Sequence, residues 1–430
     1  MGQSEKELLK EAIKLIHRGE SIESIKAKYG DLLQKVNPVE IPVIEQELVR
    51  EGLPIQDILK LCDLHVELFR SALEAKELRN VPRGHPLSNL LRENEHILRN
   101  AEGLAVLSQA LLKGNEEERR RILDSLKRYI SELKKIRIHY RKNQMILFPY
   151  LERRGINAIP RVLWGREDQA IVKIRELEKL LEQDSEKSLE KIASLSLEIS
   201  REIADLVFRE NKILYPTLWS LLSDGEWAAI AQLSQELGYV VSPEVDVWRT
   251  EEEPIFPYQL SEDGGKVVLE KLPPEVRGLV ESAVFESFDV KREGDIELRT
   301  GFLSRDQLEG IFDSIPLELT FADSNDRIKF FSKSRYMGGF PRSKSIIGRR
   351  LEFCHPPRLE NYVRLNVNLL KEGKLPYREF WTRSGDRILR VIVAGIRGRD
   401  NEYLGTLEIV EDFTEVLKNP EEIVKKIVVL

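Results

Sequence analysis

Residues 85–222 contain four long segments in which apolar side chains recur at three- and four-residue intervals. This spacing is typical of amphipathic helices, and the alternation typical of strands is rare there. Only short breakers such as "KGN" and "EQDS" separate the segments. Helices with such short connections favour an up-down-up-down four-helix bundle. We expect them at about 85–113, 116–152, 160–184 and 187–222, with a fifth helix, "GEWAAIAQLSQELG", packed against them.

One pattern occurs twice in this region, late in the second helix and late in the fourth. The copies are "HYRKNQMILFPYLE", His139–Glu152, and "LVFRENKILYPTLW", Leu206–Trp219. Each copy has a basic residue, a polar residue, an apolar "IL" and an aromatic residue followed by proline. Positions four apart share a helix face, so 139 and 143, and 206 and 210, are directed the same way. We expect the aromatic-proline pairs to break or bend the helix beyond them.

In such a bundle, the first and third helices begin at the same end at which the second and fourth helices finish. Four side chains fall there: His85, His139, Glu167 and Glu210. We expect them to converge, because imidazoles and carboxylates from facing helices hold iron or manganese in metal-binding bundles. Glu93 lies about two turns from His85, and His96 lies roughly 16 Å along the helix. We expect both to lie outside the site.

The chain is expected to be multidomain. Residues 1–78 predict a small all-α module, 79–238 the bundle, and the Pro-rich, acidic stretch 239–304 a linker with some strand. Residues 305–418 combine short helices with strands separated by turns at "DSND", at 384–386 and at 398–401. This order predicts an α+β domain with an antiparallel sheet, followed by a tail at 419–430.

These motifs resemble those of known families. "GHPL", "HYRKNQMILFPYLE", "LWGRED" and "VFRENKILYP" are similar to the hemerythrin/HHE cation-binding domain, a four-helix bundle that binds non-haem iron. Residues 1–78, with "LCDLHVELF", resemble a domain of unknown function that often precedes this bundle in archaeal and bacterial proteins. "GRRLEFCHPPRLENYV", "REFWTRSG" and "EYLGTLEIVEDFT" resemble a PAS domain. The order of the three parts matches one three-part family.

The resemblance also shows which ligands this chain lacks. The family pattern has histidine and glutamate four apart in each repeated motif and a histidine early in the third helix, but Asn143, Leu206 and Glu167 take three of those places. An oxygen-carrying di-iron centre cannot be built from what remains. Three interpretations stay open, the first being a single iron, manganese or zinc ion on His85, His139, Glu167 and Glu210. The others are a carboxylate-rich two-metal site, and a bundle without metal in which Glu167 and Glu210 pair with Arg166, Arg141 or Arg209.

Two Cys-His pairs are further candidates. Cys62 and His65 lie three apart and share a helix face, so they would suit a soft metal or a redox thiol, although the leucines around them favour ordinary packing. Cys354 and His355 precede "RLENYVRLNVNLL", a region that lines the ligand pocket in PAS domains. They would contact a small ligand, with haem as the less favoured choice. Alternatively, His355 caps or packs at the helix start before two prolines.

Composition excludes several classes of protein. The 430-residue chain has a net charge of −6 with its Lys and Arg residues dispersed, so no nucleic-acid footprint is visible. No apolar run is long enough to span a membrane, and because the charged N-terminal residues lack an apolar core we expect no signal sequence. The two cysteines suit a reducing cytosol, and the high Lys and Glu content with few Met is typical of a thermophile. We expect a cytoplasmic protein that binds neither nucleic acid nor membrane.

No phosphate-binding loop, dinucleotide fingerprint or nucleophile elbow is present. We therefore expect a sensory or regulatory protein rather than an enzyme. In this hypothesis, a reduced metal site in the bundle and the PAS domain sense metal, oxygen, redox state or a small ligand. The signal would pass through a homodimer, formed by the PAS domain or the C-terminal region, to an unknown output protein. The alternatives are a non-haem iron enzyme acting on oxygen, peroxide or nitric oxide, and a metal-free structural protein.

Overall fold

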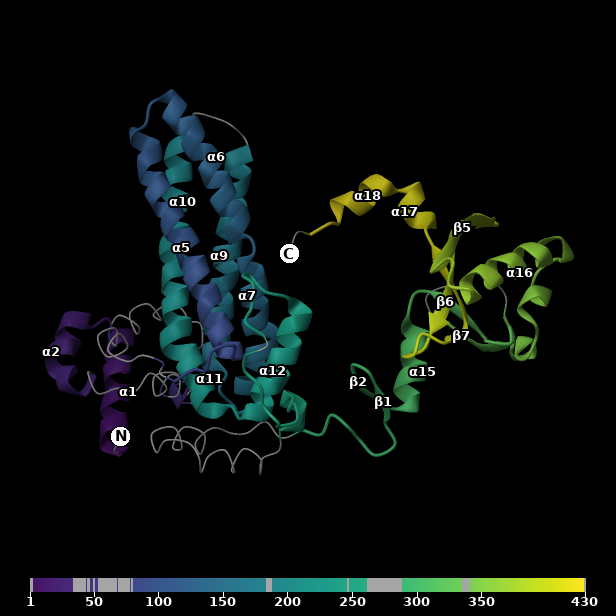
Figure 1. Cartoon of the computed structure of the whole chain (residues 1–430), viewed down its shortest axis with the longest axis horizontal. Coiled ribbons are helices and arrows are strands. Elements are labelled where there is room, and N and C mark those ends of the chain that lie inside the picture. The colour runs from purple at the N-terminus through teal and green to yellow at the C-terminus, as the bar shows by residue number, and fades with distance from the viewer. Residues whose placement is uncertain are drawn as a thin grey trace. The chain divides into compact units, whose positions relative to one another are not determined.

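The computed structural model describes residues 3–33, 44, 47–48, 51–52, 68, 78, 80–182, 188–245, 247–260, 288–334, 340 and 342–428 (Figure 1). It divides into two compact units, Met1–Phe288 and Asp289–Leu430, and each is described by itself. The predicted pair Cys62 and His65 lies outside the described residues. Among the residues that are described, no helix is both long enough and apolar enough to cross a membrane.

The first unit begins with α1 (Gln3–His17) and α2 (Ile22–Leu33). Gly19 ends α1 because its φ of +87° lies in the left-handed region, and its N–H donates to the carbonyl of Ile16. Leu9 and Ile13 of α1 and Ile25 of α2 are at most 1% exposed. This part of the chain is therefore helical with an aliphatic core, as its sequence predicts.

The bundle follows, and its helices alternate with short turns. They are α5 (Pro86–Lys113), α6 (Glu116–Leu133), α7 (Ile136–Lys142), α8 (Phe148–Arg153), α9 (Ala158–Glu182), α10 (Leu189–Arg209), α11 (Tyr215–Leu221) and α12 (Asp224–Leu237). Helix α5 packs against α6 and α10, and α9 packs against the same two helices (Figure 1). Helix α12 is the predicted fifth helix. Asn115 begins α6 and Ser223 begins α12, each through a capping box.

The second and fourth predicted helices each contain a π-helical turn, η1 (Asn143–Leu147) and η3 (Glu210–Leu214). Pro149 and Pro216 follow these turns one residue later. Proline has no N–H, and in an α-helix its ring would clash with the carbonyl four residues earlier, so a wider turn relieves the clash. The expected break at the aromatic-proline pairs is therefore a π turn through which the helix continues. The second helix is interrupted instead at residues 134–135.

Residues 239–260, in which 246 is not described, lie against the bundle rather than forming the start of a free linker. We call them the strap. The Glu244 N–H donates to Asn89 of α5 over 2.9 Å, and the Tyr150 hydroxyl donates to the Ile255 carbonyl over 2.8 Å. Gly84 is needed where the strap passes, since its φ is +78° and a Cβ there would lie 2.7 Å from Val247. The strap also contains the short 3₁₀ turn η4 (Pro257–Gln259).

The second unit starts with a hairpin of β1 (Ile296–Leu298) and β2 (Gly301–Leu303), followed by α15 (Arg305–Ser314). Its main sheet contains β3 (Glu318–Asp323), β4 (Ile328–Phe331), β5 (Tyr377–Ser384), β6 (Arg387–Arg397) and β7 (Tyr403–Asp412). The strand order is β4-β3-β7-β6-β5, and every neighbouring pair is antiparallel. The predicted α+β domain with an antiparallel sheet is confirmed.

The remaining elements of this unit lie between β4 and β5 and after β7. The 3₁₀ turns η5 (Lys344–Ile346) and η6 (Leu351–Cys354) lead into α16 (Pro357–Lys371), which contacts β6 and β7. Leu389, Val391 and Val410 form the buried centre of the sheet. The chain then continues through α17 (Thr414–Lys418) and α18 (Pro420–Lys425).

Candidate functional site

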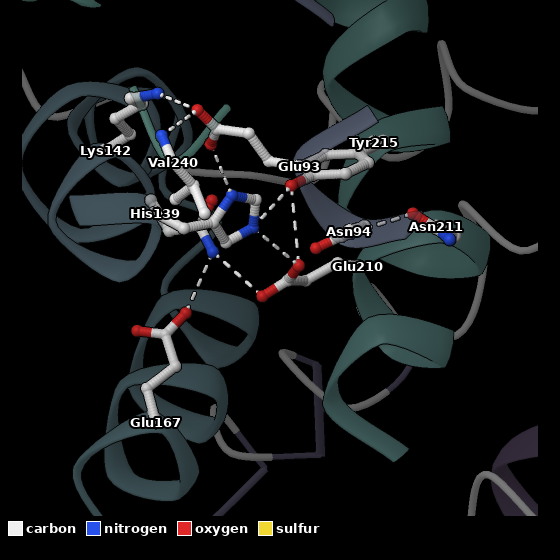
Figure 2. Close-up of polar contacts among 10 residues, drawn as sticks. Glu93, Asn94, His139, Lys142, Glu167, Glu210, Asn211, Tyr215 and Val240 are labelled. Atoms are coloured by element: carbon white, nitrogen blue, oxygen red, sulfur yellow. Dashed lines mark hydrogen bonds and ion pairs between the residues drawn. The ribbon is translucent and has the colours of Figure 1, made fainter. Parts of the chain in front are cut away.

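A group of buried polar side chains lies inside the bundle where α5, α7, α9 and η3 meet (Figure 2). Its carboxylates are Glu93 from α5, Glu167 from α9 and Glu210 from η3, and its basic members are His139 and Lys142 from α7. All five residues are at most 2% exposed. We call them, together with Asn143, Gln144 and Tyr215, the polar cluster. Because unpaired charges are costly to bury, the partners of each group decide what the cluster can do.

His139 lies between two carboxylates. Its Nδ1 is 2.8 Å from Glu93 Oε2, and its Nε2 is 2.9 Å from Glu210 Oε2 and 3.1 Å from the Tyr215 hydroxyl. Burial alone would lower the pKa of His139, but the carboxylates of Glu210 and Glu93 outweigh burial and raise it to about 9. The imidazole therefore carries a proton on each nitrogen at neutral pH and donates to both carboxylates.

Lys142 is the second cation of the cluster. Its Nζ lies 2.5 Å from Glu93 Oε1 and 4.2 Å from the centre of the Tyr239 ring in the strap. The same Glu93 oxygen accepts the backbone N–H of Val240 over 3.0 Å. Burial lowers the pKa of Lys142, while Glu93 opposes that shift. Burial would raise the pKa of Glu93, but bonding to His139 and Lys142 outweighs it and lowers that pKa, as expected for an ion pair.

Glu167 is bound by amides instead of cations. The Asn143 amide N–H₂ donates to Glu167 Oε1 and to Glu210 Oε1, both over 2.9 Å, and the Gln144 amide donates to Glu167 Oε2 over 2.7 Å. Burial and the nearby Glu210 carboxylate raise the pKa of Glu167 to about 8. Burial and Glu210 therefore favour the protonated form of Glu167, whereas the two amide donors favour its carboxylate.

The structure brings together three of the four predicted site residues, His139, Glu167 and Glu210. His85 does not join them. Its ring packs among three tryptophans, Trp219, Trp227 and Trp248, with ring centroids 4.6–5.1 Å away. Its Nδ1 accepts the Leu87 N–H as the N-cap of α5, which ties the imidazole to its own helix end.

The expectation that Glu93 lies outside the site is wrong, because Glu93 contacts His139 directly. The sequence contained a signal for it. Glu93 lies between Leu90 and Ile97, three and four positions away on the apolar face of α5, so its carboxylate must be buried. The arginines proposed as partners take other positions. Arg166 and Arg209 both bond to Asp205, and Arg141 is exposed.

The arrangement of the cluster does not fit a metal ion. A metal needs several donor atoms directed at one point. Here the two ring nitrogens of His139 face different carboxylates, and the Asn143 amide lies between Glu167 and Glu210. Across the residues that the structure describes, no group of three or more His, Cys, Asp or Glu side chains is placed to hold a metal. As arranged, these side chains do not provide the iron, manganese or zinc site of the sequence-based prediction.

A second candidate site lies in the second unit. A cavity of about 600 Å³, partly open to solvent, is lined by the sheet, η6 and α16, and both Cys354 and His355 contribute to its lining. Its walls are largely apolar and include Phe340, Phe380 and Val391. Clefts of 300–1,000 Å³ with apolar walls and a few polar groups are typical of small-molecule sites.

Polar groups inside this cavity are only partly satisfied. Arg342 bonds to Glu318 of β3 and, over 2.7 Å, to Glu408 of β7. Thr320 and Asn366 also line the cavity, are 6% and 4% exposed, and have no partner for Thr320 Oγ1 or Asn366 Oδ1. A buried polar atom without a partner costs about 1–3 kcal/mol. A ligand that donates hydrogen bonds to these oxygens would remove that cost.

His355 and Cys354 differ in what they offer to a ligand. The His355 Nδ1–H donates to the Leu351 carbonyl over 3.0 Å, so the neutral ring keeps its lone pair on Nε2. Pro356, not His355, begins α16, so the alternative in which His355 caps that helix is not observed. The Cys354 thiol is exposed and lies 3.7 Å from the Arg350 carbonyl. Partial burial raises the pKa of this thiol, which disfavours a thiolate ligand.

Comparison with known proteins supplies family matches for three stretches of the chain. Residues 9–75 match the model of a family of unknown function, DUF438. Residues 85–218 match the hemerythrin HHE cation binding domain, and residues 308–414 match a PAS domain. No curated protein matches the chain.

Two solved structures are similar to part of the chain. A C-terminal domain from Streptococcus mutans is 27% identical, with 30% of this chain and 98% of that domain covered and a TM-score of 0.28. The PAS domain of a protein from Colwellia psychrerythraea is 19% identical, with 26% of this chain and 97% of that domain covered and a TM-score of 0.21.

The family matches agree with the folds, since a helical start, a helical bundle and an antiparallel-sheet domain follow one another in the same order. A domain of a cation-binding family combined with a PAS domain indicates a sensory or regulatory protein. The chain thus consists of a DUF438 region, a hemerythrin HHE domain and a C-terminal PAS domain.

Proposed function

We propose that this is a cytoplasmic regulatory protein whose PAS domain binds a small molecule in its 600 Å³ cavity and transmits that event through protein contacts. The carrying observation is the 600 Å³ cavity itself, whose largely apolar lining includes Asn366 and Thr320, two residues with a buried oxygen that has no hydrogen-bond partner. In a domain that served only for dimerisation, these unpaired oxygens would lower the stability without any benefit. No step of this proposal passes through a metal in the bundle.

The cavity chemistry restricts the ligand. Two carboxylates already share Arg342, and Arg349 is a second guanidinium on the lining. Asn366 Oδ1 is an acceptor and requires a donor. The apolar and aromatic walls favour a flat or aliphatic body. The cavity therefore suits an amphipathic molecule with an apolar body that carries N–H or O–H groups. Haem, bound through His355 Nε2, is the less favoured alternative ligand.

Ligand retention by the purified full chain tests this proposal. The protein is denatured, and released small molecules are identified by mass spectrometry, while hemin is titrated into a second sample and its Soret band is followed. Asn366→Leu should abolish retention of the compound. Asn368→Leu, an exposed asparagine on the same helix, should leave retention unchanged. Equal retention by the two variants, or a full chain that neither retains a compound nor takes up hemin, would contradict the proposal.

The signalling step is tested by association. We expect a homodimer, formed through the PAS domain or the C-terminal segment, whose dissociation constant changes when the cavity is filled. Light scattering after size-exclusion chromatography, with and without the retained compound, measures this change. An association state that is identical in both samples would remove the dimer from the mechanism.

A further inference from the structure

The bundle contains two positive side chains where its family is described as binding a cation. We propose that Lys142 and His139 replace the metal ion in this chain, as the permanent counter-charges of the buried carboxylates. In this proposal the bundle is a metal-independent structural and regulatory element. The positive charge that balances the buried carboxylates is supplied by these two side chains.

Complete hydrogen bonding of the carboxylates supports this inference. Each oxygen of Glu93, Glu167 and Glu210 accepts at least one hydrogen bond. Two of the six oxygens receive a second donor, the Val240 N–H on Glu93 Oε1 and the Tyr215 hydroxyl on Glu210 Oε2. A metal ion would have to compete with these donors for the carboxylate oxygens.

The positions of Lys142 and His139 also support the proposal that they replace the metal ion. His139 bridges Glu93 and Glu210, and Lys142 lies one helical turn further along α7 with its ammonium against the other oxygen of Glu93. The result is one connected row from Lys142 through Glu93 and His139 to Glu210 (Figure 2). A divalent ion placed beside this row would add positive charge to carboxylates that are already paired, in a region where charge is poorly screened.

The differences between this sequence and the family pattern also favour a cluster without a metal ion. Asn143 occupies a place where the pattern has glutamate, and its amide donates to the two carboxylates that a metal would otherwise join. Replacing a carboxylate by an amide removes one negative charge and adds donors. Both effects lower the affinity of the cluster for a cation and increase its stability without one.

Metal analysis of the full chain is the first test. The protein is exposed to Fe(II) without oxygen, to Mn(II) and to Zn(II), desalted, and analysed for bound metal. We expect no stoichiometric metal, and a melting temperature by circular dichroism that neither a chelator nor any of these ions changes. Stoichiometric metal whose removal by a chelator lowers the melting temperature would overturn the proposal.

Substitution of the internal cation is the second test. Lys142→Met keeps the length of the side chain and removes its charge, which leaves Glu93 without its ammonium partner. We expect the bundle to melt roughly 6–20 °C lower. Lys134→Met is the matched control, because Lys134 pairs with Glu178 over 2.6 Å but is 42% exposed in its side chain, so its melting should change little.

A double variant keeps the test decisive even where Lys142→Met does not fold. Lys142→Met combined with Glu93→Gln removes both charges of the pair and leaves an amide whose oxygen accepts from Val240, while its N–H₂ donates to Nδ1 of a neutral His139. We expect this double variant to fold and to melt above the single variant. A single variant that melts like the wild type, or a double variant that melts no higher than the single one, would exclude a counter-charge role for Lys142.

Discussion

Replacing His85 by asparagine tests whether the imidazole is held neutral among the tryptophans. Burial lowers the pKa of His85 to about 4, compared with about 6.5 in an unfolded chain. Asparagine is an equally good N-cap, so the bond from the Leu87 N–H can be kept while the titrating group is removed. The variant therefore separates the proton effect from the capping effect.

The size and sign of the effect follow from the two pKa values. Above pH 6.5 the imidazole is neutral in both the folded and the unfolded chain, and it contributes no pH dependence. Between pH 6.5 and 4 only the unfolded chain takes up the proton, so the stability of the wild type falls as the pH falls. At pH 5 the loss is about 2 kcal/mol relative to pH 7.5, and below pH 4 it approaches about 3.4 kcal/mol.

Urea unfolding followed by tryptophan fluorescence at pH 7.5 and pH 5 measures this loss, since three of the tryptophans surround His85. We expect the difference in unfolding free energy between the two pH values to be smaller by about 2 kcal/mol in His85→Asn than in the wild type. His96→Asn removes an imidazole from the same helix outside the tryptophan contacts and serves as the control. An unchanged pH difference in His85→Asn would refute the neutral, buried state of this ring.

Other substitutions test the packing around the two candidate sites. Glu226→Ala removes the partner of the buried Arg154 guanidinium, 2.7 Å away, and should destabilise the bundle by about 3–5 kcal/mol in urea unfolding. Tyr150→Phe removes the hydroxyl that holds the strap and should cost about 1 kcal/mol in the same assay and speed proteolysis of the strap. Gly405→Ala would place a Cβ 2.1 Å from a carbonyl oxygen of β3 and should lower the melting temperature of the second unit, whereas Gly310→Ala, in an open helical position, should not. Equal calorimetric melting of the two glycine variants would contradict the close approach of β3 and β7.

The helices and strands were predictable because local patterns determine them. Apolar spacing determined the long helices, and "DSND" and Ser384-Gly385-Asp386 determined two of the turns in the second unit. The π turns were not predictable to the same degree. Proline at 149 or 216 implies a local disturbance, but whether the helix breaks or widens depends on what packs around it. The strap was mistaken for a linker because its contacts with α5 and α8 are made by backbone groups and single side chains, which leave no periodic signal.

The members of the polar cluster were predictable only in part, for a related reason. His139, Glu167 and Glu210 stand at helix positions that the antiparallel arrangement brings together, so topology alone places them. Lys142 was overlooked because lysine is almost always exposed, and only a three-dimensional contact with Glu93 explains its burial. His85 was wrongly assigned to the site because its position at the helix end indicated that it lies close to the other three residues. Its ring instead packs among the tryptophans.

The two candidate sites differ in a way that assigns them different roles. In the bundle, every carboxylate oxygen of the polar cluster already has a donor, and the cavity of about 280 Å³ beside α5 and α12 reaches Lys142 but none of these carboxylates. In the PAS domain, Thr320 and Asn366 line a cavity that is large enough for a ligand, and each has a buried oxygen without a partner. In the polar cluster the atom left without a partner is Asn143 Oδ1, whereas the carboxylates are bonded, and bonded buried networks rigidify the fold around them. The proposed ligand therefore belongs to the cavity of the PAS domain, whereas in the bundle Glu93 accepts the Val240 N–H and so holds the strap against α5.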